Sequence, residues 1–301
     1  MNALSPNLSV SNALSSRAMV VSLTISQWSA QRLDRRVTEE VTAQKNAAKD
    51  AGNFNKHLLP KEALEGINKV VSATRGEFLE RTLPWLNDGS RIMKADAFMA
   101  HSAWFQKQKA KFFEAVDEFI AKYPAYKADA QRRMGDMFDQ GDFPLAMEIR
   151  QRFDMKMTIM PAPSADDFRV QMSEHQAAAI RSEIETSITT AANNAVRNIY
   201  ERIHEVASRM VERLTAYKPS TGKGDRAEGT FRDSLVLNVR DLCAIMPALN
   251  ITGNPELDRL AGELEKLGRF DADTLRFSDR ARDETKKQAQ DILDQIGAFI
   301  A

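Results

Sequence analysis

The sequence predicts a mainly α-helical protein with a small antiparallel sheet, an α+β fold in which a compact N-terminal domain precedes an elongated helical hairpin or bundle. Two observations predict this class. Alternating apolar and polar residues, the pattern of a half-buried strand, occur clearly in only two segments. Apolar residues at helical spacing fill almost all of the rest. A chain of 301 residues is long enough to bury a core in one large domain or two modest ones.

The first strand segment is VVSLTISQW, in which Val21, Leu23 and Ile25 alternate with serine and threonine. The second is RFDMKMTIMPAP, which alternates in the same way over 153–159. A weaker strand pattern covers 168–172. We expect these segments to pair in one small antiparallel sheet, which ties the two ends of the first half of the chain together.

Helical spacing predicts eight helices and one short turn. The helices cover 34–49, 61–82, 94–122, 125–139, 173–217, 230–249, 255–266 and 272–300, and the turn lies at 145–150. Pro60, Pro84, Pro124 and Pro144 lie at their boundaries. Proline is tolerated in the first turn of a helix or just beyond its end, so we expect a helix break at Pro124.

The longest predicted helix, 173–217, opens with a capping-box spacing from Ser173 to Gln176. Its apolar residues step by three or four, as in a coiled-coil seam, at Ile180, Ile184, Ile188, Ala192, Val196, Ile199, Ile203, Val206, Met210, Leu214 and Tyr217. An unbroken helix of this length would extend about 60 Å. We expect the three later helices to pack against it as antiparallel partners.

These elements divide the chain into three predicted regions. Residues 1–17 are rich in serine and asparagine and are predicted to be disordered. Residues 18–165 form the predicted α+β domain with the small sheet, and residues 166–301 form the predicted long helical hairpin or bundle. No segment approaches the ~20 consecutive apolar residues of a membrane span, so we expect no membrane association.

Motifs for catalysis and for cofactor or metal binding are incomplete in this chain. The loop STGKGD resembles a phosphate-binding loop, but it lacks the upstream glycine and has Gly224 where serine or threonine would hold magnesium. The segment HEVAS, which starts at His204, begins like the helix of a zinc protease. Ser208, however, stands where that helix has its second histidine. Cys243 is the only cysteine, which excludes an internal disulfide and fits a reducing cytoplasm. We expect no enzymatic activity, no cofactor and no metal.

The stretch HSAWFQKQKAKFFEA, residues 101–115, combines aromatic rings with lysines. Its phenylalanines belong to a series that recurs every seven residues, at Phe98, Phe105, Phe112 and Phe119, and is predicted to be core. Trp104 falls on the far side of the predicted helix, beside His101, Lys107 and Lys111. An indole flanked by cations is typical of a surface on which nucleic-acid bases stack. The alternative is that Trp104 packs under a loop or against another helix.

Overall charge does not favour a polyanion partner, because 42 lysines and arginines balance 42 aspartates and glutamates. The distribution is uneven, however. Residues 91–111 hold five basic residues against one acid, whereas residues 251–301 hold eleven acids against eight bases. A nucleic acid is therefore expected to bind the N-terminal half.

The candidate nucleic-acid-binding residues share a positive charge or a ring in that half of the chain. They are Arg32, Arg35, Arg36, Lys45, Lys49, Phe54, Lys56, Arg91, Lys94, His101, Trp104, Lys107 and Lys111. Phe54 lies in the basic loop QKNAAKDAGNFNKH, which is predicted to be mobile and to close over a single strand. The alternative for this loop is a solvated linker with Phe54 in the core.

Four phrases carry a resemblance to a known family: SLTISQWSAQRLD, NFNKHLLPKEAL, RTLPWLNDGSRIM and FDMKMTIMPAPSADDFR. Over about residues 20 to 300 the chain resembles a family of phage and mobile-element proteins, and within it the Drc-type early regulators of phages that carry a virion RNA polymerase. The resemblance implies a single-stranded-DNA-binding protein that helps a phage RNA polymerase engage its promoters. It transfers no binding residue to this chain.

Together, charge and resemblance favour a sequence-tolerant single-stranded-DNA-binding protein that regulates early or middle phage transcription, or replication. The helical half would serve self-association or contact with the polymerase. Two alternatives stay open: a helical adaptor or structural protein that does not bind DNA, and an inhibitor of a host enzyme.

Overall fold

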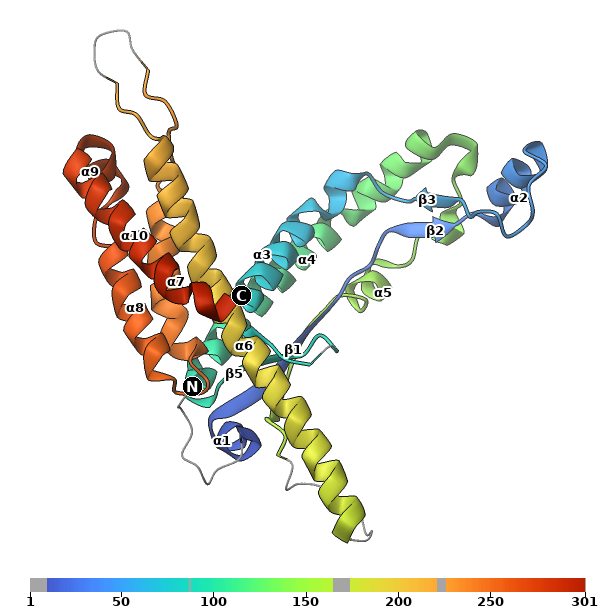
Figure 1. Ribbon diagram of the computed structural model, residues 1–301. Coiled ribbons are helices and arrows are strands. Elements are labelled where there is room, and N and C mark those ends of the chain that lie inside the picture. The colour runs from blue at the N-terminus through green and yellow to red at the C-terminus, as the bar shows by residue number, and fades with distance from the viewer. Residues whose placement is uncertain (1–9, 87, 165–173, 221–225, 301) are drawn as a thin grey trace. The chain divides into compact units, whose positions relative to one another are not determined.

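The computed structural model describes residues 10–86, 88–164, 174–220 and 226–300 (Figure 1). The helices are α1 (Val10–Arg17), α2 (Arg35–Gln44), α3 (Glu65–Glu80), α4 (Phe98–Met134), α5 (Ala146–Arg150), α6 (Glu174–Ala216), α7 (Ser234–Leu249), α8 (Pro255–Leu267), α9 (Ala272–Phe277) and α10 (Asp279–Ile300). The strands are β1 (Ala18–Ser26), β2 (Gln31–Leu33), β3 (Asn55–His57), β4 (Leu83–Pro84), β5 (Arg91–Lys94) and β6 (Asp154–Pro161). Short 3₁₀ helices are η1 (Lys61–Leu64), η2 (Ala95–Ala97), η3 (Gly135–Met137) and η4 (Gln140–Asp142). The predicted class, mainly α with a small antiparallel sheet, is confirmed.

The sheet has the strand order β4-β5-β1-β6. In the antiparallel pair β1–β5, Ala18 lies opposite Lys94 and Val21 lies opposite Arg91. The two predicted strand segments are thus β1 and β6, although the first begins at Ala18, ahead of the alternating run. The sequence did not predict β4 and β5, because two and four residues are too few to show an alternating pattern. The strand pattern at 168–172 lies outside the described residues.

The predicted break at Pro124 is wrong, because α4 continues through this proline. One ring contact spans the proline, because Phe119 stacks on Tyr126 with ring centroids 6.4 Å apart. Phe119 packs against Tyr123 with ring centroids 6.1 Å apart, and the Tyr123 hydroxyl donates to the Pro144 carbonyl at 2.9 Å. Packing therefore outweighs the missing backbone donor and the ring clash of a proline inside a helix.

Three other helix predictions also need correction. The helix predicted over 34–49 ends at Gln44, two residues before Asn46 adopts a positive φ of 49°. The segment 61–82 is divided between η1 and α3, and the segment 272–300 is divided at Ser278 between α9 and α10. The predicted capping residue Ser173 lies outside the described residues.

The chain forms two compact units, and each is discontinuous in sequence. Unit 1 comprises Met1–Ser22, Leu79–His101 and Ile159–Ala301, and unit 2 comprises Leu23–Phe78 and Ser102–Thr158. These units do not follow the predicted boundary at residue 165, because α1 and β4 both pack against α6 and join the C-terminal helices.

The prediction of disorder also fails for part of the N-terminus. Residues Val10–Arg17 form α1, with Ser11 and Leu14 buried. Residues 1–9 lie outside the described residues.

Unit 1 is built around a bundle in which α6 packs against α7 and α10, and α8 packs against the same two helices (Figure 1). The apolar seam predicted for the long helix supplies its core. Ile188, Ile199, Ile203, Met210 and Leu214 are all buried. The 3.6-residue period of the sequence thus determines which face of α6 its partners cover.

Unit 2 is built around α4 and most of α3. Phe112 and Phe119 lie on one face of α4, and both contact Phe153. The ring centroids of Phe112 and Phe119 lie 6.3 and 6.0 Å, respectively, from the ring centroid of Phe153. Trp28 packs against Phe119 at 6.2 Å. The phenylalanine series is therefore core, as its seven-residue spacing predicts; Phe98, which lies in unit 1, is half-buried.

Candidate nucleic-acid interface

Trp104 does not form part of an exposed surface. Its indole is 8% exposed and stacks on Phe78, with ring centroids 6.5 Å apart and planes at 17°. The indole nitrogen donates to a Glu77 carboxylate oxygen, which also accepts from the Gln108 amide at 3.0 Å. The expectation of a stacking surface at Trp104 is wrong, because α3 covers the side of α4 opposite the phenylalanine face.

His101 is also buried, within unit 1. Burial, together with the charge of Arg81, lowers the pKa of His101 to about 4. The imidazole is neutral at pH 7 and cannot neutralise a phosphate. Its predicted role beside a nucleic acid is therefore not supported.

Arg91 is engaged at the C-terminus of α3. Its guanidinium donates to the Thr82 hydroxyl at 3.0 Å and to the carbonyls of Leu79 and Thr82 at 3.0 and 2.7 Å. Arg202 donates to the same two carbonyls at 2.9 and 2.8 Å. Burial and the nearby Arg202 charge lower the pKa of Arg91 to about 10. Two cations therefore bind carbonyls at and just after the end of this helix, where the helix dipole favours them.

Lys94 is more accessible than Arg91 but has an acidic neighbour. Its side chain is about one-third exposed, and its ammonium lies 3.7 Å from the Asp96 carboxylate. Because Arg91, Lys94 and His101 all belong to unit 1, they form a group separate from the predicted residues of unit 2.

Seven of the predicted residues of unit 2 lie within residues 31–57, which we call the arm. β2 and β3 pair antiparallel, with Arg32 opposite Lys56, and α2 lies at their end (Figure 1). Asp34 caps α2 by accepting from the backbone nitrogen of Val37 at 3.1 Å. Helix α2 buries none of its side chains. The arm is thus ordered by hydrogen bonds at its base and not by an apolar core.

Lys56 forms the base of the arm and is only 7% exposed. Its ammonium lies 3.2 Å from the Asp34 carboxylate, 2.5 Å from the Asp142 carboxylate and 3.2 Å from the Met137 carbonyl. Although burial opposes the charged form, hydrogen bonds to Asp142 and Asp34 raise the pKa of Lys56. The backbone N–H of Val37 and then Lys56 lower the pKa of Asp34. Contrary to the prediction, the Lys56 ammonium is not available to a phosphate, because two carboxylates and one carbonyl of this chain bind it.

Above this base, the arm exposes cations. Within the described residues, no carboxylate lies within 4.0 Å of the exposed Arg35, Lys45 or Lys49. Arg32 and Arg36 are 62% and 68% exposed and have only long contacts to acids, 3.5 Å to Asp142 and 3.8 Å to Glu40.

An aromatic ring lies among these cations. Phe54 is 36% exposed, and its backbone is fixed at both ends: the nitrogen donates to the Thr38 hydroxyl at 3.0 Å, and the carbonyl accepts from Asp34 N at 2.9 Å. Beside α2 lies a shallow hollow of about 130 Å³, which is lined by Leu33, Arg35, Thr38, Glu39, Thr42, Lys49 and Asn53. The arm therefore presents a ring, hydroxyl groups and unpaired cations on one small element.

Lys107 and Lys111 are exposed on α4 but lie far from the arm. The arm is attached at the other end of α4, where the Arg133 guanidinium donates to the His57 carbonyl at 2.7 Å. Twenty-two residues separate Lys111 from Arg133, which is roughly 33 Å along a helix. The predicted residues of unit 2 thus form two groups and not one patch.

The sequence did not predict the two acids that hold Lys56. Asp34 had a local signal, since it precedes a helical run and is a favoured N-cap residue. Asp142 had none, because it reaches Lys56 from a distant 3₁₀ helix and only the tertiary fold brings the two together.

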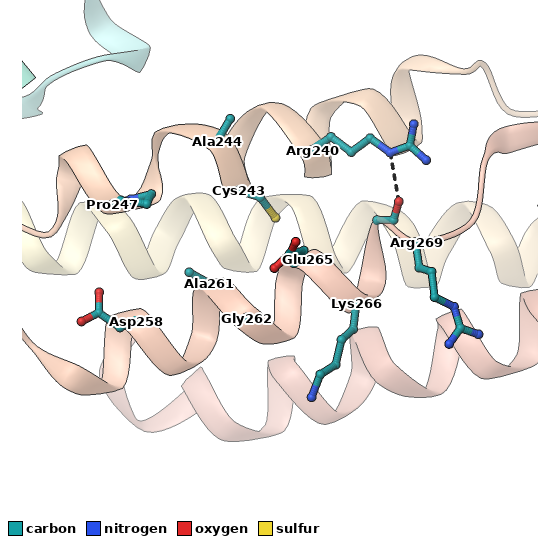
Figure 2. A pocket seen from close by; sticks show the side chains of 11 residues that line it. Arg240, Cys243, Ala244, Pro247, Asp258, Ala261, Gly262, Glu265, Lys266 and Arg269 are labelled. Atoms are coloured by element: carbon teal, nitrogen blue, oxygen red, sulfur yellow. Dashed lines mark hydrogen bonds between the residues drawn. The ribbon is translucent and has the colours of Figure 1, made fainter. Parts of the chain in front are cut away.

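A groove of about 1160 Å³ lies between α7 and α8 of unit 1 (Figure 2). Small residues, Ala244, Ala261 and Gly262, lie along it. Arg240 at one end donates to the Gly268 carbonyl at 2.9 Å. Burial, and then Glu265, raise the pKa of the Cys243 thiol to about 11, so this thiol is protonated at neutral pH. A protonated thiol is a poor nucleophile, so the groove carries no reactive cysteine at neutral pH.

Three further observations concern metal sites, membrane spans and similarity to known proteins. Within the described residues, no three histidine, cysteine or carboxylate side chains lie together as a metal site would require. None of the described helices combines the length and apolarity needed to cross a bilayer. Comparison with protein-family models, with curated proteins and with solved structures finds no match to this chain.

Proposed function

We propose that this protein is a non-enzymatic, sequence-tolerant single-stranded-DNA-binding protein, and that its arm makes the contact with DNA. One observation carries the proposal: Arg35, Lys45 and Lys49 are exposed without a carboxylate partner on the element that also exposes the Phe54 ring. Lysine and arginine side chains that neutralise phosphates release the counterions condensed on the nucleic acid, and this release is the main source of sequence-tolerant affinity.

The ring favours a single strand over a duplex. A base in a single strand can leave its neighbours and stack on an aromatic side chain, which contributes roughly 1–3 kcal/mol and tolerates any base. Phe54 is fixed through its backbone to Asp34 and Thr38, so little conformational freedom is lost when a base stacks on it. A duplex would meet the cations of the arm but would offer the ring no free base.

The same proposal places the protein in the host cytoplasm and in early or middle phage transcription, or in replication. This part rests on the resemblance of the chain to Drc-type regulators. The groove between α7 and α8 is the surface proposed to contact a phage RNA polymerase or a second copy of the chain, because small side chains let another helix approach closely. Self-association would lead to cooperative coating of the strand.

The proposal is tested by fluorescence anisotropy with a labelled oligothymidylate at several salt concentrations. The variant Arg35→Gln/Lys45→Gln/Lys49→Gln should weaken binding at least tenfold in low salt and reduce the slope of log affinity against log salt by about 2, at ~0.7 per phosphate contact. The matched control is Lys107→Gln/Lys111→Gln/Lys122→Gln, which removes three exposed charges from α4. Equal losses in the two triple variants would move the interface away from the arm.

A helical adaptor or host-enzyme inhibitor is the second candidate, and the α7–α8 groove is the observation that favours it. Such a protein would bind its partner through unit 1 and ignore the arm. Unmodified protein that does not bind the oligonucleotide in low salt would leave this candidate in place of the first.

A further inference from the structure

A second pocket in unit 1 gathers cations instead of small side chains. It has a volume of about 420 Å³ and lies between the C-terminal part of α6 and the start of α7. Arg209 and Arg213 reach it from successive turns of α6, and Arg232 reaches it from the segment before α7. Glu212 is the one acid among the residues that line the described part of this pocket.

The three arginines differ in how far they are neutralised. Arg209 forms an ion pair with Glu205 at 2.6 Å. Arg213 has only Glu212, at 4.0 Å. For Arg232 the described residues offer no carboxylate within that distance. Among the described residues, the carboxylates near this pocket are therefore too few to balance its three guanidinium charges.

Polar groups suited to an anion complete the lining. Thr230 and Ser234 supply hydroxyl groups, and Asn238 supplies an amide. Ser234 is also the first residue of the sixteen-residue helix α7, whose N-terminus adds a partial positive charge. Forked guanidinium groups together with hydroxyl donors match the several acceptor oxygens of a phosphate group.

Neighbouring contacts hold the segment that carries Arg232 in place. The Phe231 ring is buried and meets Tyr217 edge-on at 5.1 Å. The Arg276 guanidinium lies over that ring at 5.3 Å and donates to the Phe231 carbonyl at 2.9 Å. Gly229 has a φ of +60°, and a Cβ there would lie 2.2 Å from the Ala216 carbonyl oxygen, so no other residue fits this close approach. The backbone on either side of Arg232 is thus fixed before any ligand arrives, which lowers the entropy lost on binding.

We propose that this pocket binds a small anion of the phosphate class, either inorganic phosphate or a phosphate monoester. Its volume lies in the range typical of small-molecule sites. The pocket is separate from the arm in chain position and in the unit that carries it, so the proposal does not rest on DNA binding.

The test measures binding to the full chain by isothermal titration calorimetry in a phosphate-free chloride buffer. The probes are inorganic phosphate, adenosine 5′-monophosphate and adenosine. We expect saturable phosphate binding at one site, a loss of about tenfold or more in Arg213→Gln/Arg232→Gln, and a smaller loss in Ser234→Ala. The matched control is Arg280→Gln/Lys287→Gln, which removes two exposed charges from α10 and should bind as the unmodified protein does.

The probes also distinguish the two sources of the anion. Equal affinity for phosphate and the nucleotide indicates free phosphate, whereas tighter binding of the nucleotide than of phosphate or adenosine indicates a monoester. Three results would overturn the proposal: no saturable phosphate binding, an equal loss in the control, or displacement of phosphate by an oligonucleotide. Thermal unfolding of each variant without ligand verifies that the substitutions leave the fold intact.

Discussion

Residues 101–115 and the arm, residues 31–57, have the same local signature of basic side chains around an aromatic ring, yet their rings have opposite environments. Trp104 is 8% exposed, and Phe54 is 36% exposed. The difference follows from packing partners. α4 is covered on one side by Phe78 and Glu77 and on the other by Phe153, whereas α2 buries no side chain. In these two segments, a ring among basic residues therefore stays exposed only on the element that lacks a second packing partner.

The largest expected effect is on stability, at Trp104. Trp104→Ala removes a buried ring and leaves the Glu77 carboxylate without the indole donor. We expect the free energy of unfolding to fall by about 3–5 kcal/mol, measured by urea denaturation. The affinity of the folded fraction for an oligonucleotide should stay the same. A variant of normal stability with weakened DNA binding would return Trp104 to the interface.

The next effect is a pH dependence of unit 1 caused by His101. Its folded pKa of about 4 lies below the unfolded value of ~6.5, so the unfolded state binds more protons between these values. Stability is then complete above about pH 6.5 and decreases as the pH falls towards 4, by up to about 3 kcal/mol. Urea denaturation at pH 7 and pH 4.5 measures this loss. His101→Gln should remove most of the difference, and an unchanged pH dependence in that variant would contradict the assignment.

Those parts of the fold could be predicted in which a single helix or strand is long enough to show its own periodic pattern of apolar residues. The apolar seam of α6 and the phenylalanine series of α4 have a period that determines the buried face whatever packs on it. The pairing of β5 with β1 could not be predicted, because a four-residue strand has no detectable period. The discontinuous units depend on such pairings, and so a boundary drawn along the chain could not reproduce them.

The candidate site was less predictable, because each side chain was judged by its neighbours in sequence. Lys56 and Lys49 look alike in the sequence, but only Lys56 meets a carboxylate from residue 142. Arg91 likewise resembles a surface cation until the fold brings it to the carbonyls of Leu79 and Thr82. Long-range partners thus decided which cations stayed available.

A smaller effect is expected at Lys56, which tests whether the arm depends on its base. Lys56→Met keeps the length of the side chain but leaves Asp34 and Asp142 without their shared cation. We expect a local loss of about 1–3 kcal/mol, seen as faster hydrogen exchange of amides in residues 31–57.

Lys45→Met is the matched control, because Lys45 is exposed on the same arm. Equal exchange in the two variants would show that Lys56 does not hold the arm.

The arm should also loosen in acid, because the pKa of Asp34 is lowered in the folded state. The contribution of Asp34 to stability is therefore present above about pH 4 and is lost as the pH falls through the folded pKa.

The smallest change in stability is expected at Phe54, where the comparison with Trp104 is reversed. Phe54→Ala should lower the free energy of unfolding by about 1 kcal/mol or less, because the ring is partly exposed and its backbone bonds to Thr38 and Asp34 remain.

The same variant should weaken the free energy of binding to single-stranded DNA by about 1–3 kcal/mol, the contribution of one stacked base. The salt slope should not change, since the ring carries no charge, whereas it decreases when Arg35, Lys45 and Lys49 are neutralised. Anisotropy titrations of both variants at three salt concentrations separate these contributions. If Phe54→Ala instead destabilised the protein as much as Trp104→Ala and left DNA affinity intact, exposure of the ring would have no bearing on function.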